Sequence, residues 1–402
     1  MTLVQASVPW DHEARRAFAD PTFPVAEYEA RVARLRAELA RAGLTHLLAY
    51  SNFADPGNVR WLSGFNTSYG DSLVVVAPDA EPLLVTNWAL HDEPMHAGIY
   101  QSWLRDTRVV PRGDAGLVAE VAGYVRQHGG AGGARIGLAG QRVAPAWVVA
   151  GLRGALDVDG FADGDTPLLA ARRLKSPLEV ATLRRAARIT GAGLAAALAA
   201  CVPGVTERAV AATAHGTMFA AGADALAFDT AVASGGRRAG MKHCAPTWRT
   251  MAEGDLVFLD LGACVDGYSA DVSRCVAVGA PTPEGRRLLA AGEALYHGVA
   301  AIAKPGTPVA ALHAEALRLA GELGYADAYM RQGFGHGLGC MLFERPDLRY
   351  GQSDEVLEPG MTFAYEPMLV VTGLGTAVVE ETMLVTEAGL EPLSGLPTRL
   401  YS

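Results

Sequence analysis

The chain has 402 residues, of which 50% are apolar and 19% are charged, so its length favours two domains and its composition excludes a disordered chain. Its 34 basic and 43 acidic residues give a net charge of −9, which excludes a general electrostatic attraction to nucleic acid or to an anionic membrane. We therefore expect neither nucleic acid nor a membrane as a partner.

The cysteines and the N-terminal segment favour a cytoplasmic protein. The five cysteines are an odd number without a CxxC pair, which is typical of a reducing compartment and disfavours a disulfide framework or a structural zinc site. The first 20 residues have no apolar run of the kind found in secretory signals, and we expect them to form an arm. The most apolar stretch, 191–205, is too short to span a bilayer.

The first half of the chain alternates between helix and strand patterns. Residues 26–42 carry apolar side chains at helical spacing and are followed by Gly43. Strand patterns are present at 46–51, 59–62, 72–77, 82–86 and 135–138, with a helix pattern at 115–127. This alternation predicts an α/β domain, with helices packed on a mixed or parallel sheet.

A domain boundary is predicted near Ser176. This residue can cap a helix that has Pro177 at its first position and Glu179 as the acid of a capping box. The expected domains are therefore 1–174 and 175–402. The second part has helix patterns at 177–201, 205–222, 283–303 and 308–323 and strand patterns at 228–234, 255–263, 273–278, 361–371 and 377–386. These patterns predict an α+β domain.

Two aspartates accompany the strand patterns of the second half. Asp260 and Asp271 lie on either side of a predicted turn, so a hairpin would bring both carboxylates together. Two neighbouring carboxylates repel each other unless a cation lies between them. Taken singly, each aspartate is also explained as a turn or capping residue.

One histidine and two glutamates extend this set. His336 lies in the glycine-rich segment GFGHGLG, Glu366 follows the strand pattern MTFAY, and Glu380 follows AVV. Each has an ordinary structural explanation on its own. Together, four carboxylates and one imidazole suit two divalent ions such as Mn, Fe, Co or Zn, which can activate water for attack on a carbonyl or amidine carbon.

The order of these residues resembles metallopeptidase family M24. The resemblance is carried by GDLVFLDLGACVDGYSADVSRCVAVG (254–279), GHGLG (335–339), LEPGMTFAYEP (357–367) and VVEETMLVTEAG (378–389), and more loosely by NVRWLSGF (58–65). It implies a pita-bread catalytic domain that follows a creatinase/prolidase-like N-terminal α/β domain. It also implies two divalent metal ions, whose ligands would be Asp260, Asp271, His336, Glu366 and Glu380, with Asp271 and Glu380 as bridges.

The resemblance implies further roles as well. His243 would face the substrate and either assist proton transfer or orient the scissile group, and Glu366 would accept a proton as general base through a water molecule. A dipeptide or small-molecule substrate and a homodimer are expected on the same grounds.

The chain departs from the family pattern at Phe343. Proline-specific members usually carry a second histidine there, and a phenyl ring cannot donate a hydrogen bond to a developing oxyanion. Either Arg345, Arg349 or Gln332 supplies the donor, or the substrate is not a peptide.

The expected substrate-binding residues are Phe343, Arg345 and Tyr69. Tyr69 belongs to a set of aromatic residues that either close the pocket of a neighbouring subunit or belong to the core of the first domain. The set consists of Trp61, Phe65, Tyr69 and Trp88.

Three functions are compatible with these residues. The first is a dinuclear metal-dependent hydrolase of a C–N bond, similar to Xaa-Pro dipeptidases and aminopeptidases. The second, favoured by Phe343, is a small-molecule hydrolase or lyase of the same fold, as creatinase, ectoine hydrolase and dimethylsulfoniopropionate lyase are. The third is a catalytically silent binding protein, which the presence of all five ligand positions disfavours.

Overall fold

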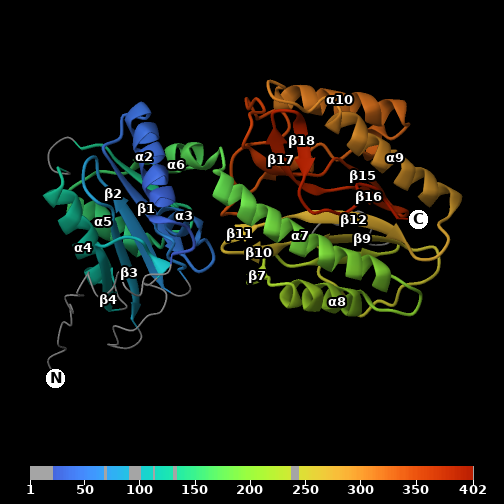
Figure 1. Cartoon of the computed structure of the whole chain (residues 1–402), viewed down its shortest axis with the longest axis horizontal. Coiled ribbons are helices and arrows are strands. Elements are labelled where there is room, and N and C mark those ends of the chain that lie inside the picture. Colours follow the sequence, from blue (N-terminus) through green and yellow to red (C-terminus); the bar gives the residue numbers. More distant parts are fainter. Residues whose placement is uncertain are drawn as a thin grey trace. The chain divides into compact units, whose positions relative to one another are not determined.

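The chain forms two compact units, Met1–Arg172 and Arg173–Ser402 (Figure 1). The computed structural model describes residues 21–67, 70–89, 101–111, 114–129, 134–236 and 244–401. His243, Tyr69 and the expected N-terminal arm lie outside these ranges, as does the side chain of Trp88.

The first unit is built on a six-stranded mixed sheet in the order β4-β3-β2-β1-β5-β6. Pairs β1–β2 and β2–β3 are antiparallel, whereas β3–β4, β1–β5 and β5–β6 are parallel. Its elements are α2 (Val25–Arg41), β1 (His46–Asn52), α3 (Gly57–Ser63), β2 (Asp71–Val76), β3 (Leu83–Ala89), β4 (Thr107–Pro111), α4 (Asp114–Gln127), β5 (Ile136–Ala139), α5 (Ala146–Leu156), β6 (Ala162–Asp163) and α6 (Asp165–Arg172). The mixed sheet with packed helices confirms the predicted α/β architecture.

The prediction of a strand at 59–62 is wrong, because these residues belong to helix α3. A short apolar run has no period that separates strand from buried helix, and here packing decides the outcome. Trp61 is 1% exposed and Phe65 is 5% exposed, so both are core aromatics rather than lid residues. The helix ends at Gly64, whose φ of +78° is a left-handed conformation that favours glycine.

The second unit begins with the predicted helix cap. The Ser176 side chain accepts a hydrogen bond from the Glu179 N–H at 3.2 Å, and the Glu179 carboxylate accepts one from the Ser176 N–H at 3.0 Å. This reciprocal pair confirms the capping box, with Pro177 in the first turn of α7.

The described residues of the second unit form four small sheets and the helices that cover them. The sheets have the orders β12-β9-β8, β13-β14-β17-β18, β15-β16 and β11-β10-β7. The elements are α7 (Pro177–Ala200), α8 (Glu207–Ala220), β7 (Ala225–Leu226), β8 (Ala231–Ser234), β9 (Leu256–Leu261), β10 (Ala263–Val265), β11 (Tyr268–Ser269), β12 (Val272–Ala277), α9 (Pro283–Ala300), α10 (Val309–Glu322), η2 (Ala326–Ala328), β13 (Gly335–Gly337), β14 (Thr362–Tyr365), β15 (Met368–Val371), β16 (Gly375–Val378), β17 (Glu381–Thr386) and β18 (Gly389–Pro392). Helices and short strands together confirm the predicted α+β character.

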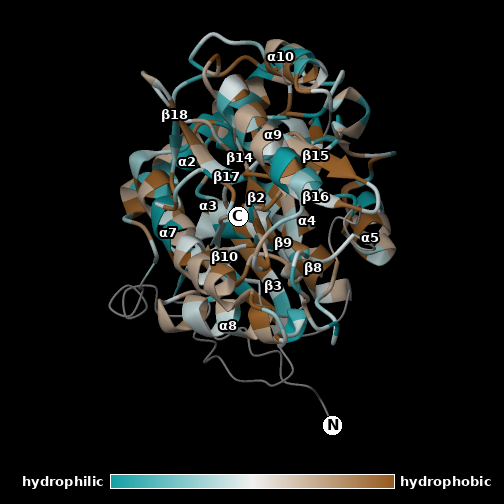
Figure 2. Cartoon of the chain, turned by 90° about the vertical axis from the view of Figure 1, so that its right-hand side faces the viewer, coloured by the Kyte–Doolittle hydropathy of each residue, from teal (hydrophilic) through white to brown (hydrophobic). Residues whose placement is uncertain are grey.

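Helices cover the central β12-β9-β8 sheet on both of its faces. Val257 and Leu259 pack into a core with α7 and α8, whereas Leu256 and Phe258 pack into a second core with α9 and α10. Figure 1 shows α7 and α8 on one side of β9 and β12, with α9 and α10 on the other side. Figure 2 shows these helices carrying both hydrophilic and hydrophobic residues, as expected for helices with one face in a core.

The strand patterns at 361–371 and 377–386 each correspond to two strands rather than one. The first divides into β14 and β15 at Glu366 and Pro367, and the second into β16 and β17 at Val379 and Glu380. Proline has no N–H to continue a ladder, which explains the first break. None of the described helices combines the length and apolarity that crossing a membrane requires.

Candidate metal centre

The predicted hairpin brings Asp260 and Asp271 to the same region. Strands β9 and β12 pair antiparallel, with Asp260 opposite Ser273, and Asp271 directly precedes β12. Asp260 has the parity of Phe258 along β9, so strand alternation puts its side chain on the sheet face that looks toward α9 and α10. Asp260 is 8% exposed and Asp271 is 5% exposed. The hairpin therefore carries two buried acidic residues at neighbouring positions.

The start of β17 is hydrogen-bonded to this hairpin. The Thr382 hydroxyl accepts from the Asp271 N–H and donates to the Asp271 carbonyl oxygen, both at 2.9 Å. The Glu380 N–H donates to the Ser273 carbonyl oxygen at 3.1 Å. These contacts bring Glu380 next to Asp271, although the two residues are far apart in the sequence.

The glycines around His336 permit close backbone contacts. Strand β13 pairs with β14, where His336 lies opposite Ala364. Gly335 has φ of +146°, and a Cβ atom at this position would lie 2.1 Å from the Ala364 carbonyl oxygen. A Cβ atom at Gly337 would lie 2.2 Å from the Glu344 carbonyl oxygen. Only glycine therefore lets β13 approach both of its neighbours.

The His336 ring is oriented toward Asp271. Its Nδ1 donates to the Gly337 carbonyl oxygen at 3.3 Å, and its Nε2 lies 3.3 Å from Asp271 Oδ2. Burial lowers the pKa of His336, but the hydrogen bond and charge of Asp271, with the charge of Glu366, raise it above its ordinary value overall. The site therefore has an electrostatic field that attracts positive charge.

Asp271, His336 and Glu380 form a compact group of ligand atoms. One ligand atom from each residue lies within 4.8 Å of the others. Within the described part of the chain, Asp271 Oδ1 is buried and has no hydrogen-bond partner. A buried carboxylate oxygen without a partner is costly, and a metal ion would satisfy it. The residues present therefore fit a divalent metal ion.

The other two predicted ligands, Asp260 and Glu366, lie on a strand and directly after a strand. Asp260 is on β9, and Glu366 follows β14, where its N–H donates to the Phe334 carbonyl oxygen at 3.0 Å. Both carboxylates are buried, at 8% and 9% exposure, but neither belongs to the group of three within 4.8 Å. Their assignment as ligands stays a prediction.

Phe343 lies beside the metal-binding group. Its ring is centred 4.3 Å from the His336 ring at an interplanar angle of 48°, and the side chain is 62% exposed. An exposed phenyl ring in contact with the histidine provides an apolar surface next to the group, without a hydrogen-bond donor.

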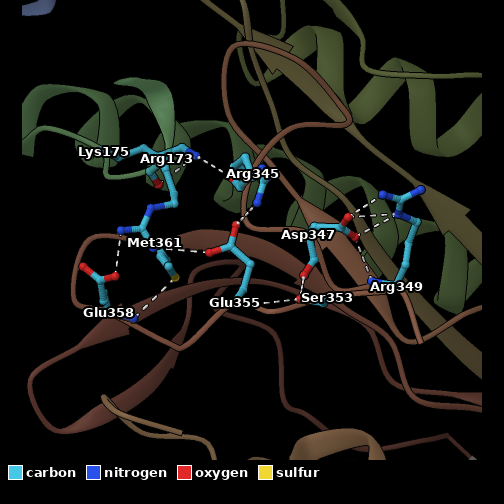
Figure 3. Close-up of polar contacts among 9 residues, drawn as sticks. All are labelled: Arg173, Lys175, Arg345, Asp347, Arg349, Ser353, Glu355, Glu358 and Met361. Carbon is cyan, nitrogen blue, oxygen red and sulfur yellow. Dashed lines mark hydrogen bonds and ion pairs between the residues drawn. The ribbon is translucent and has the colours of Figure 1, made fainter. Parts of the chain in front are cut away.

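The two arginines expected as substitute donors are both held by carboxylates (Figure 3). Arg345 Nη1 donates to Glu355 Oε1 at 2.8 Å, and Arg349 Nε donates to Asp347 Oδ1 at 2.9 Å. Gln332, the third candidate, is exposed. A role of Arg345 in substrate binding stays a prediction.

The second unit also contains two buried ion pairs that the sequence patterns did not predict. Lys175 Nζ lies 3.6 Å from Glu344 Oε1, and both side chains are 1% exposed. Arg274 and Glu381 form the second pair, and both of their side chains are fully buried. For Arg274 and Glu381 the available signal was a charged residue inside an apolar strand pattern, VSRCVAVG and VVEETMLV, because a buried charge requires a partner.

Comparison with known families classifies this architecture. Residues 181–387 match metallopeptidase family M24, and residues 31–174 match the creatinase/prolidase N-terminal domain. The chain therefore belongs to metallopeptidase family M24, as its motifs predicted.

Individual relatives agree with this classification. The Xaa-Pro dipeptidase of Pyrococcus furiosus is 34% identical over 239 residues, which are 59% of this chain and 68% of that protein. The uncharacterized peptidase YqhT of Bacillus subtilis is 36% identical over 233 residues, 57% of this chain and 64% of that protein. The structure of an Xaa-Pro dipeptidase from Bacillus anthracis superposes with a TM-score of 0.80 at 26% identity, covering 93% of this chain and 99% of the other. The predicted fold class, with its pita-bread catalytic domain, and the hydrolase assignment are confirmed.

Proposed function

We propose that this M24 metallopeptidase hydrolyses the peptide bond of Xaa-Pro dipeptides with two bound divalent metal ions. The observation that carries the proposal is the group formed by Asp271, His336 and Glu380, whose ligand atoms lie within 4.8 Å of one another. The dipeptide substrate is supported by relatives that are named Xaa-Pro dipeptidases. Asp260 and Glu366 complete the proposed ligand set.

The proposed ligands have distinct tasks. When bound, the metal ions supply Lewis-acid polarisation of the scissile carbonyl and lower the pKa of water. His336 Nδ1 donates to the Gly337 carbonyl oxygen, which orients the ring so that Nε2, 3.3 Å from Asp271 Oδ2, would bind a metal ion together with that carboxylate. In this proposal Glu366 accepts the proton of the attacking water and His243 assists its transfer to the leaving amine.

The ring of Phe343 would contact the apolar part of a bound substrate. Its exposure of 62% and its contact with His336 support this role. The same observation favours a second candidate function, the hydrolysis of a small-molecule C–N bond, because a phenyl ring cannot stabilise the oxyanion of a peptide substrate.

The experiment that separates these functions is a substrate panel on chelator-stripped, full-length protein. Xaa-Pro dipeptides are compared with amidines, ureas and N-methyl amino acids after addition of Mn, Co, Zn or Fe. Metal-dependent release of proline supports the dipeptidase, whereas metal-dependent turnover of the other compounds alone supports the second candidate. Turnover that is unchanged by removal of metal contradicts both.

The remaining parts of the proposal concern domains, assembly and location. Residues 1–174 and 175–402 would be the two domains, the second of them catalytic, and the protein would be a cytoplasmic homodimer. Light scattering on the purified protein tests the homodimer, and a monomer mass would contradict it.

A further inference from the structure

Arg274 lies at the centre of β12, and its side chain is fully buried. Removing a guanidinium from water is costly unless its five N–H donors find acceptors. Arg274 Nη1 donates to the carbonyl oxygens of Ser273 at 2.8 Å and Glu380 at 2.6 Å. Nε and Nη2 donate to the Pro397 carbonyl oxygen at 3.2 and 3.0 Å, and Nη2 also donates to Glu381.

These contacts converge on the peptide groups of Glu380. Its N–H donates to the Ser273 carbonyl oxygen, and its own carbonyl oxygen accepts from Arg274. The Glu380 main chain is therefore held against β12 on both sides of the residue. Asp271 lies only three residues before Arg274 on the same segment, so the guanidinium joins the two chain segments that carry Asp271 and Glu380.

The ion pair with Glu381 lies behind the metal-binding group. The Glu380 carboxylate lies with Asp271 and His336, whereas the Glu381 carboxylate accepts from Arg274, so these two consecutive side chains point to different sides. The Glu381 carboxylate also accepts a hydrogen bond from the Ser394 hydroxyl at 2.8 Å. Arg274 and Glu381 thus form a buried support that leaves the Glu380 carboxylate on the side of Asp271 and His336.

We propose that Arg274 is a positioning residue of the metal centre, which sets metal affinity by holding the Glu380 main chain against β12. The inference rests on the metal site of the proposed function. Lysine cannot replace this arginine, because a single ammonium group cannot reach the four groups that the planar guanidinium spans. Loss of residues that orient metal ligands typically weakens metal binding about 10- to 100-fold.

The test measures Mn²⁺ affinity by isothermal titration calorimetry on chelator-stripped, full-length protein. Arg274→Lys is expected to raise the Mn²⁺ Kd about 10- to 100-fold. Co²⁺ loading supplies a second readout, because displaced ligands change its visible absorption spectrum. The matched control is Arg172→Lys, since Arg172 is also a buried arginine, 1% exposed, but lies in the first unit. Its Kd is expected to equal that of the wild type.

A variant of the partner covers the case in which Arg274→Lys does not fold. Glu381→Gln keeps the size of the side chain and a hydrogen-bond acceptor but removes its charge, and it should also raise the Kd. If Arg274→Lys folds and has the Kd and the Co²⁺ spectrum of the wild type, the proposal is overturned. If Arg274→Lys does not fold, wild-type Mn²⁺ affinity of Glu381→Gln overturns it. Equal weakening by Arg172→Lys also overturns it, because the effect would then be one of global stability.

A third variant separates this inference from the proposed function. His336→Ala should abolish Mn²⁺ binding at the site. If His336→Ala binds Mn²⁺ as the wild type does, the proposed metal site is wrong. If His336→Ala loses binding while Arg274→Lys keeps it, the metal site stands and only the role of Arg274 is wrong.

Discussion

Replacing Phe343 by histidine should increase the turnover of Xaa-Pro dipeptides. The Phe343 ring is centred 4.3 Å from the His336 ring, so an imidazole at this position would lie beside the metal-binding group. Since the side chain is 62% exposed, the substitution removes little buried apolar area and should leave the melting temperature close to that of the wild type.

The expected magnitude follows from the value of one oxyanion donor. Removal of such a donor typically costs about 2.7–4 kcal/mol of transition-state stabilisation. An added imidazole on an exposed loop is less well oriented, and half of the lower figure, about 1.4 kcal/mol, corresponds to a tenfold rise in kcat.

The assay is steady-state release of proline by the Mn²⁺-loaded enzyme. Phe343→Ala is the matched control, because it removes the ring without adding a donor and should give no rise in kcat. A Phe343→His variant that is no faster than Phe343→Ala would refute the reasoning, since a missing donor would then not limit turnover.

Three further predictions concern the metal ligands, the close contact between β13 and β14, and a buried carboxylate. Asp260→Asn should abolish activity and reduce metal content, and unchanged turnover would remove Asp260 from the ligand set. Gly335→Ala should lower both the melting temperature and the Mn²⁺ affinity, because its Cβ would lie 2.1 Å from the Ala364 carbonyl oxygen. Wild-type values of both would contradict the close contact between Gly335 and Ala364. Burial raises the pKa of Glu207, but hydrogen bonds from Thr247 and Ser234 lower it further, so the pKa is below its ordinary value of 4.5 overall. The ionised carboxylate therefore stabilises the fold at pH values above 4.5. This contribution is lost as the pH falls through the lowered pKa. Glu207→Gln should therefore destabilise the protein by about 1.5–3 kcal/mol at pH 7, and chemical denaturation at decreasing pH should show the difference from wild type shrinking; a constant difference would contradict the ionic role.

The hairpin of the candidate site was predictable from local sequence. Asp266 and Gly267 have φ of 51° and 83°, the backbone that an Asp-Gly turn adopts, and they join β10 to β11. The apolar runs on either side predicted the paired strands, with Asp260 in one and Asp271 directly before the other. Local patterns were sufficient because the turn and the strand partners are close in sequence.

Features that depend on distant packing were not predictable in this way. The apolar run at 59–62 predicts a strand, whereas these residues belong to helix α3. The burial of Trp61 depends on elements elsewhere in the chain, and the run itself does not report them. The contact of Thr382 with Asp271 and the pairing of Arg274 with Glu381 join residues more than a hundred positions apart. A sequence pattern reports that a charge is buried, but not which segment supplies its partner.

The most direct test of the central claim is the metal content per chain. Protein purified without chelator or added metal would be measured by inductively coupled plasma mass spectrometry, before and after reconstitution. The proposed function predicts close to two ions of Mn, Fe, Co or Zn per chain. No bound metal, even after reconstitution, would contradict it, because Asp271, His336 and Glu380 would then converge without forming a metal centre.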